Sequence, residues 1–294
     1  MKTRTSGARI SVIEQAEEGQ QSSSYNEIFT QALSWGDPSQ KENSSSSYFF
    51  DDPNAWTDAV ETLLNKASSA LGSLSSVKSI CVSGTSASCL VVDADANKVT
   101  RKPRMYNYDV VASRKPDEDP IYSVKAMELL DEYAPAKHTA RARSGSLAKL
   151  LTWNEEKRFG RSEVLCHQSD YVSMILQSNN RSCGSGPDNK WEVSSDWHNC
   201  LKLGYDVQNQ KWPDWMKTVL QKATGLDNPL QILPHKVVSP GQAMGTISRD
   251  VAQQYGLPED TIIVGGTTDS NAAFFAAAGA KPVVGTAVTS LGST

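Results

Sequence analysis

The spacing of apolar residues along the chain predicts several helices. Across Asn54–Leu74, apolar side chains recur three and four positions apart, which predicts a helix with one buried face. The same spacing predicts a helix over residues 145–153, for which Ser144 or Ser146 is a candidate N-cap. Further helices are predicted over residues 121–133, 212–220 and 271–280.

Short apolar runs between these helices predict strands. The runs lie at residues 10–13, 79–82, 89–92 and 261–264, and a return strand is expected from 98. Strands that alternate with helices favour an α/β architecture. Residues 283–290 also have strand character, but no partner follows them, and the first strand begins abruptly. We therefore expect a domain that is cut at both ends.

The composition is that of a folded protein without a strong charge field. The 294 residues include 29 basic and 33 acidic side chains, a formal net charge of −4. Such a chain offers no positive surface for nucleic acid or an anionic membrane, so neither is expected as a partner, whereas a small anionic ligand needs only local donors. The apolar stretches are shorter than the roughly 20 residues that a membrane-spanning helix needs.

The cysteines and the first residues bear on the compartment. The five cysteines form no C-x-x-C pair, which leaves a zinc or redox motif without support and favours a reducing compartment. Cys81 and Cys89 adjoin predicted strands and are interpreted as small core residues. The basic, Ser/Thr-rich start is typical of a transit peptide, but acidic residues follow at Glu14 and Glu17, so no complete targeting segment is predicted.

Three polar stretches are expected to be surface loops. Residues 20–24 and 44–47 are rich in serine. The segment 178–190 is polar and contains two glycines and a proline, so we interpret it as an exposed insertion without a catalytic role.

Asp269 is the first candidate for chemistry, because it follows a strand and two glycines and precedes a helix. One interpretation makes it an N-cap, whose carboxylate accepts bonds from the first free amides of the helix. The other notes that ligands of α/β sheets bind at the carboxyl ends of strands, where a carboxylate can accept a proton from a substrate hydroxyl. Both interpretations can hold together.

Two loops of small hydroxyl residues, 84–88 and 289–294, could present backbone amides to phosphate or sugar oxygens. Neither is a G-x-x-x-x-G-K-[ST] phosphate loop. The run Asp196–Asn199 joins a carboxylate, an aromatic ring and an amide, the types that bind and stack on sugars; a loop whose Trp197 packs inward explains it equally well. The four histidines share no metal-ligand spacing, which favours structural roles.

Several segments together resemble the FGGY carbohydrate kinases, with the greatest likeness to the plant and cyanobacterial xylulose kinase-like, or D-ribulose, kinases. The order of the segments is kept over nearly the whole chain. They are GGTTDSNAA at 265–273, AVTSLGST at 287–294, SDWHN at 195–199 with KLGYD at 202–206, and SLAKLL at 146–151.

The resemblance implies an actin-like, ribonuclease H-like α/β fold of two domains, with ATP and sugar meeting between them. It places an FGGY N-terminal domain, with the sugar site and the catalytic base, at residues 1–280. The opening of a truncated, nucleotide-binding C-terminal domain then lies at 281–294. The implied cofactors are ATP and Mg²⁺, and the implied partner is a small-molecule sugar; the oligomeric state is not implied.

The family's functional residues carry over by position. Asp269 matches the catalytic base, which also contacts the sugar. The matches to phosphate-binding positions are Thr5, Ser6, Gly7, Thr289, Gly292, Ser293 and Thr294. The expected sugar-side residues are Ser86, Asp196 and Trp197. One position departs from the family: Lys2 stands where the family has an aspartate that helps to hold magnesium, so no metal ligand is assigned.

The resemblance implies ATP-dependent phosphorylation of a ketopentose, D-ribulose first and D-xylulose second. A catalytically impaired, truncated product that at most binds sugar is the alternative, favoured by Lys2 and by the expected lack of the nucleotide-binding part. Another actin-like ATPase is disfavoured by the segments SSDWHN at 194–199 and TTDSNAAF at 267–274. Full-length plant relatives are expected in the chloroplast, and the incomplete transit peptide leaves the cytoplasm as the second location.

Overall fold

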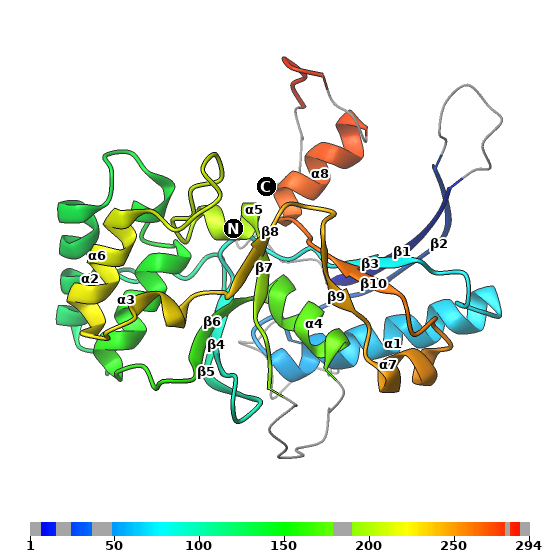
Figure 1. The fold of residues 1–294 in the computed structure, drawn as a ribbon, viewed down its shortest axis with the longest axis horizontal. Coiled ribbons are helices and arrows are strands. Elements are labelled where there is room, and N and C mark those ends of the chain that lie inside the picture. Colours follow the sequence, from blue (N-terminus) through cyan, green and yellow to red (C-terminus); the bar gives the residue numbers. More distant parts are fainter. Residues whose placement is uncertain (1–6, 16–24, 37–48, 179–189, 280–282, 289–294) are drawn as a thin grey trace.

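The computed structural model describes residues 7–15, 25–36, 49–178, 190–279 and 283–288. Within these ranges strands and helices alternate along most of the chain (Figure 1), which confirms the predicted α/β architecture. The Ser-rich stretches 20–24 and 44–47, and residues 179–189 of the expected insertion, lie outside the described residues.

A three-stranded antiparallel sheet separates two hydrophobic clusters. Its strands, with β4 in the middle, are β4 (Cys89–Asp93), β5 (Lys98–Arg104) and β6 (Glu163–His167). Successive side chains of a strand point to opposite faces. Leu90 and Val92 accordingly join one cluster, while Cys89 and Val91 join the other. Because both faces of β4 are covered, its first four residues, 89–92, are all apolar and buried.

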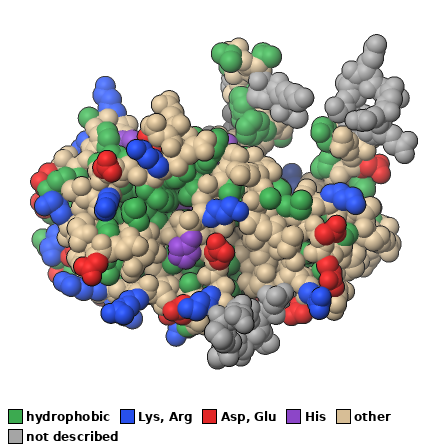
Figure 2. Space-filling view, in the orientation of Figure 1, with side chains coloured by type: hydrophobic (Ala, Val, Ile, Leu, Met, Phe, Trp, Pro, Cys, Tyr) green, Lys and Arg blue, Asp and Glu red, His purple; other side chains and the backbone are tan. Residues whose placement is uncertain are grey.

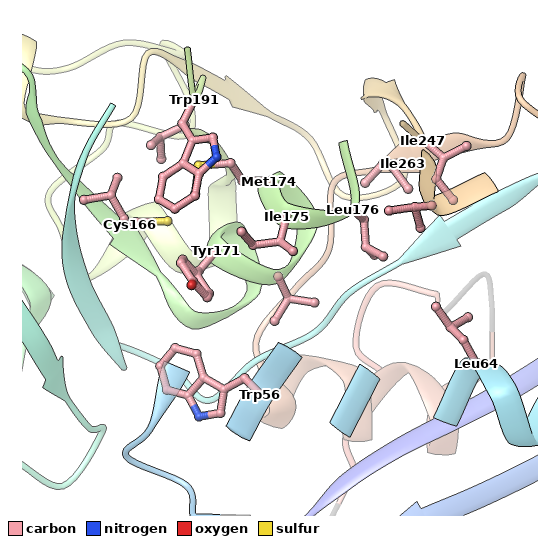
Figure 3. Packing of buried hydrophobic residues seen from close by; sticks show 14 of the residues in the cluster. Trp56, Leu64, Cys166, Tyr171, Met174, Ile175, Leu176, Trp191, Ile247 and Ile263 are labelled. Carbon is pink, nitrogen blue, oxygen red and sulfur yellow. The ribbon is translucent and has the colours of Figure 1, made fainter. Parts of the chain in front are cut away.

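The first cluster lies among three helices, α1 (Pro53–Leu71), α4 (Gln168–Gln177) and α7 (Arg249–Tyr255). Its large rings pack edge-on, as Figure 3 shows. The Tyr171 ring centroid lies 6.0 Å from that of Trp56 and 6.1 Å from that of Trp191. Edge-to-face pairs of this kind add about 0.5–1.5 kcal/mol beyond their burial.

Helix α1 begins and ends at residues that its sequence marks. Asp52 accepts a hydrogen bond of 3.0 Å from the Asn54 amide, and Pro53 occupies the first helical position, where no amide is needed. Gly72, with φ +72°, ends the helix in the left-handed conformation. The helix predicted over 54–74 is therefore confirmed.

The second cluster is enclosed by α2 (Pro120–Tyr133), α3 (Ser146–Glu156) and α6 (Asp214–Thr224), with the short 3-10 helices η2 (Thr139–Arg141) and η3 (Pro229–Ile232). Leu130, Leu147 and Leu220 come from three different helices and are fully buried in it. The three helices predicted from apolar spacing are confirmed, with ends that move by a few residues.

The remaining strands of the described residues form three further sheets. They are the antiparallel pair β1 (Ala8–Gln15) and β2 (Tyr25–Leu33), the set β3 (Ser79–Cys81), β10 (Ile262–Val264) and β9 (Ala243–Thr246), and the parallel pair β7 (Ser194–Asp196) and β8 (Lys236–Val238). Helix α5 (Trp197–Leu201) follows β7. The strands predicted near residues 10, 79, 89, 98 and 261 are confirmed.

Three local predictions are wrong. The N-cap of α3 is Gly145, without a side-chain bond, because the Ser146 hydroxyl is used by His167 instead. Cys81 is exposed rather than buried, since it lies at the end of an edge strand, whereas Cys89 is buried as expected. Residues 283–288, the described part of the strand expected at 283–290, contain a turn and no strand.

Helix α8 (Asp269–Ala278) has no buried residue, and Phe275 is 39% exposed. It projects from the body of the molecule in Figure 1, and Figure 2 shows hydrophobic side chains over it. No helix within the described residues has the length and apolar character needed to cross a membrane.

We expect this exposed apolar helix to drive self-association of the purified chain. Replacing Phe275 by Ser should lower the apparent mass in sedimentation velocity at tens of micromolar protein. Val124→Ser, at a 47% exposed position of α2, is the matched control and should leave the mass unchanged. A parent chain that sediments as a single monomer at these concentrations contradicts the expectation.

Candidate functional site

Two parallel strands end side by side at the centre of the site. β10 pairs with β3 in parallel register, with Ile262 opposite Ser79. The chain then passes through Gly265 and Gly266. A Cβ added to Gly266 would lie 1.7 Å from the Val82 carbonyl oxygen, so only glycine permits this approach. The loops that follow β3 and β10 therefore leave from the same edge, where ligands of α/β sheets bind.

Asp269 lies on the second of these loops. Its amide donates to the Gly84 carbonyl at 2.9 Å, and the Gly84 amide donates to the Thr267 carbonyl at 3.3 Å. The N-cap of α8 is Thr268, so the expected N-cap role of Asp269 is wrong. Asp269 is the first helical residue, and among the described residues its carboxylate accepts a hydrogen bond from the adjacent Ser270 amide alone, at 2.8 Å. The carboxylate is exposed and lies at the positive end of a helix dipole.

The loop 84–88 is fixed by hydrogen bonds along its length. The Gln168 side-chain oxygen accepts from both the amide and the hydroxyl of Thr85, at 3.1 and 3.0 Å. The Ser88 hydroxyl accepts from the Tyr106 amide at 2.8 Å. Ser86 is half-buried, and no hydrogen bond to another described residue uses its hydroxyl. The loop is therefore a rigid support with one hydroxyl to offer.

A third chain segment, from β7 into α5, reaches the same edge. His198 forms a 2.7 Å hydrogen bond through Nδ1 with the Thr267 hydroxyl, and its ring centroid lies 6.4 Å from that of Phe275 in α8. His198 and Thr267 were not singled out from the sequence. Each belongs to a segment that was, but nothing local shows that residues 69 positions apart meet.

Asp196 caps helix α5 with a buried carboxylate. Its side chain accepts from the amides of His198 and Asn199, at 2.9 and 3.1 Å, and from the Asn199 side chain at 2.6 Å. Burial raises the pKa of Asp196, and the nearby Asp170 carboxylate raises it further. These internal bonds give Asp196 a role in orienting α5. Trp197, the next residue, is half-buried rather than packed inward; sugar contacts of both residues stay predictions.

A buried cluster of polar side chains lies behind the loop 84–88 and the segment from β7 into α5. The His167 ring lies 3.1 Å from the Ser146 hydroxyl and 2.9 Å from the Asp170 carboxylate, and Ser195 approaches to 3.4 Å. Serine, histidine and aspartate in this order suggest a hydrolytic triad, but all three side chains are at least 98% buried, so no substrate reaches them. The cluster joins α3, β6, α4 and β7 and is structural, as the sequence favoured for the histidines.

Most residues expected to bind phosphate lie outside the described residues. They are Thr5, Ser6, Thr289, Gly292, Ser293 and Thr294; Lys2 also lies outside the described residues. Gly7 is described: its φ is +141°, and an added Cβ would lie 1.8 Å from the Leu33 carbonyl oxygen. This contact alone requires glycine there. Among the described residues, no three His, Cys, Asp or Glu side chains gather as a metal site would need.

The fold is shared with solved sugar kinases. No family model matches the chain. Its structure is similar to those of a xyloylose kinase from Brucella ovis (22% identity, TM-score 0.64), a carbohydrate kinase from Novosphingobium aromaticivorans (15%, 0.59) and a xylulose kinase from Rhodospirillum rubrum (19%, 0.59). The matches cover 91, 92 and 85% of this chain and 48, 49 and 45% of the others, so the chain spans about half their length.

These similarities define the class of fold. The chain has the actin-like, ribonuclease H-like fold of sugar kinases, over the part that carries the two parallel strand ends and Asp269. The fold expected from the sequence is thereby confirmed.

Proposed function

We propose that this chain is the sugar-binding, base-carrying part of an ATP-dependent carbohydrate kinase of the FGGY family. The observation that carries the proposal is the position of Asp269, an exposed carboxylate beside the loop 84–88 at the ends of two parallel strands. The sugar kinases of similar fold and the FGGY-like segments 265–273 and 195–199 support the same conclusion.

In the proposed reaction, Asp269 accepts the proton of a sugar hydroxyl while the hydroxyl oxygen attacks the terminal phosphorus of ATP. The bond between that phosphorus and the oxygen of the leaving ADP breaks, and the proton stays on the carboxylate. Phosphoryl transfer depends on positioning and charge stabilisation, so one oriented carboxylate is the chief contribution expected from this part of a kinase. The Asp269 amide, held by Gly84, fixes the position of that carboxylate.

Magnesium is implied by the FGGY resemblance and would neutralise phosphate charge when bound. The described residues do not by themselves form a site for it, since Asp269 is an isolated exposed carboxylate and Asp196 is occupied by helix α5. Lys2 adds a positive charge at the position where the family has a metal-binding aspartate. No step of the proposed reaction is therefore assigned to a metal held by these residues.

The proposed substrate is a ketopentose, with D-ribulose ahead of D-xylulose. The likeness of the FGGY segments to ribulose kinases favours the first sugar, and the xylulose kinase from Rhodospirillum rubrum favours the second. The second candidate function is sugar binding without phosphate transfer, and Lys2 is the observation that favours it.

Calorimetric titration of the purified chain with D-ribulose, D-xylulose and glycerol tests the proposal. We expect a pentulose to bind with a Kd at or below about 1 mM, equivalent to about −4 kcal/mol, and glycerol to bind more weakly. In a separate ATPase assay we expect ATP consumption close to the no-enzyme control, because the sequence has Lys2 at the position where the FGGY family has a metal-binding aspartate. Absence of pentulose binding contradicts the proposal, and rapid ribulose-dependent ATP consumption contradicts the impaired alternative.

A further inference from the structure

Lys149 is a fully buried cation without an acidic partner among the described residues. It lies on α3, its exposed fraction is 0%, and its Nζ donates to the carbonyls of Ala87 and Met105, at 2.8 Å each. Two of the charged side chains that act on it, Lys202 and Arg104, are also positive. Burying an unpaired charge destabilises a folded protein, so we ask what Lys149 contributes that offsets this cost.

One of the two acceptors is an unusual residue. Ala87 has φ +63°, a left-handed conformation that costs a residue with a Cβ about 1 kcal/mol or more. It belongs to the loop 84–88, which begins at Gly84, the residue bonded to the Asp269 amide. The strained residue, the free hydroxyl of Ser86 and the contact to Asp269 therefore lie within four consecutive residues. Strain of this kind gathers at functional sites.

We propose that Lys149 is a positioning residue that holds Ala87 in its left-handed conformation and so fixes the loop 84–88 in the shape that presents Ser86 to the sugar beside Asp269. The part of this inference that concerns sugar binding rests on the proposed function, whereas the part that concerns the conformation of the loop 84–88 does not. Lys149 acts through the Ala87 carbonyl and has no access to substrate itself.

The chemistry of the buried amine agrees with this role. Burial lowers the pKa of Lys149 to about 8; Cys89 on β4 raises it, while Lys202 after α5 and Arg104 on β5 lower it further. The neutral amine has two N–H bonds, and two carbonyls accept them. As the pH rises through about 8, the amine therefore loses its buried charge without losing either hydrogen bond.

The test compares Lys149→Met, which keeps the apolar stem, with Val251→Ala, a destabilising control in the distant helix α7. Hydrogen exchange of the Asp269 amide, which is bonded to the loop, is the readout that needs no sugar. We expect exchange at Asp269 to speed by about tenfold or more in Lys149→Met and to change little in Val251→Ala at matched stability. D-ribulose affinity should fall by about tenfold in Lys149→Met alone.

A double-mutant cycle with Ala87→Gly shows whether Lys149 acts through Ala87. Glycine adopts positive φ without strain, so Lys149→Met should weaken sugar binding less in the Ala87→Gly background than in the parent. If Lys149→Met fails to fold, Lys149→Gln, whose amide keeps two N–H bonds, is measured in its place.

The outcomes separate the two proposals. Unchanged exchange at Asp269, or strictly additive effects of the two substitutions on stability and affinity, overturns the role of Lys149. If the parent chain binds no pentulose, the proposed function fails, and the exchange rates and the stability cycle still decide whether Lys149 fixes the loop. Faster exchange together with non-additive effects supports the inference.

Discussion

Replacing Asp269 by Asn is expected to lower turnover about 10²–10⁴-fold, the usual contribution of a general base. The measurement requires a protein in which this chain is joined to a second half like that of the sugar kinases of similar fold. Asparagine keeps the size of the side chain and the acceptor for the Ser270 amide but removes the basic oxygen. The exposed carboxylate makes no other hydrogen bond with a described residue that the substitution would break. Stability and sugar affinity should therefore stay close to the parent values.

Turnover, sugar affinity and melting temperature measured on the same variant separate the base from a structural role. If Asp269 served only the start of α8, Asn would replace it with little effect on turnover or stability. Ser270→Ala is the matched control, because it lies at the next position of α8 and keeps the backbone amide that Asp269 accepts from. A turnover within about threefold of the parent, far from the general-base range, would show that Asp269 is not the base.

The features of the fold that were predicted correctly are local ones. Apolar spacing located α1, α2, α3 and α6, because each buries one face against a cluster. The sequence 261–271 located the carboxylate, because a strand, two glycines and a helix follow one another directly and Asp269 lies at their junction. That arrangement predicts a loop at a strand end without knowledge of the neighbouring strand.

The features that could not be predicted depend on contacts between distant residues. Lys149 bonds to Ala87 and Met105, which are 62 and 44 positions away, and in the sequence it is one of several polar residues in α3. Ser146 has the residue type and place of an N-cap, yet its hydroxyl serves His167 in the core. In both cases the tertiary partner, and not the local propensity, decides what the side chain does.

A buried ion pair on the sheet β5-β4-β6 also depends on contacts between residues that are distant in the sequence. Arg101 of β5 bonds to Glu163 of β6 at 3.1 Å, and both side chains are 8% exposed. The guanidinium also donates to the Trp153 carbonyl at 2.7 Å and to the Lys157 carbonyl at 2.8 Å. These bonds fasten β5 and β6 to the end of α3, the helix that carries Lys149.

Glu163→Gln should lower the free energy of unfolding by about 3 kcal/mol at pH 7, because it leaves a buried guanidinium without its counter-charge. Glu155→Gln is the control: Glu155 pairs with Lys125, whose side chain is 51% exposed, so the loss should stay below about 1 kcal/mol. Urea unfolding of both variants measures the difference. Equal losses would show that the buried charge is compensated by the carbonyls alone.

The pH dependence gives this prediction a second test. Burial opposes ionisation of Glu163, but hydrogen bonds from Thr100, the Gly160 amide and Arg101 outweigh it, so the pKa of Glu163 lies below its ordinary value. A carboxyl whose pKa is lowered by folding contributes stability above its unfolded pKa of about 4.3 and loses that contribution as the pH falls through the folded value. The stability difference between the parent and Glu163→Gln should therefore be full at pH 6–7, by this linkage, and shrink below about pH 4. A difference that stays constant down to pH 3 would mean that the charge of Glu163 does not stabilise the fold.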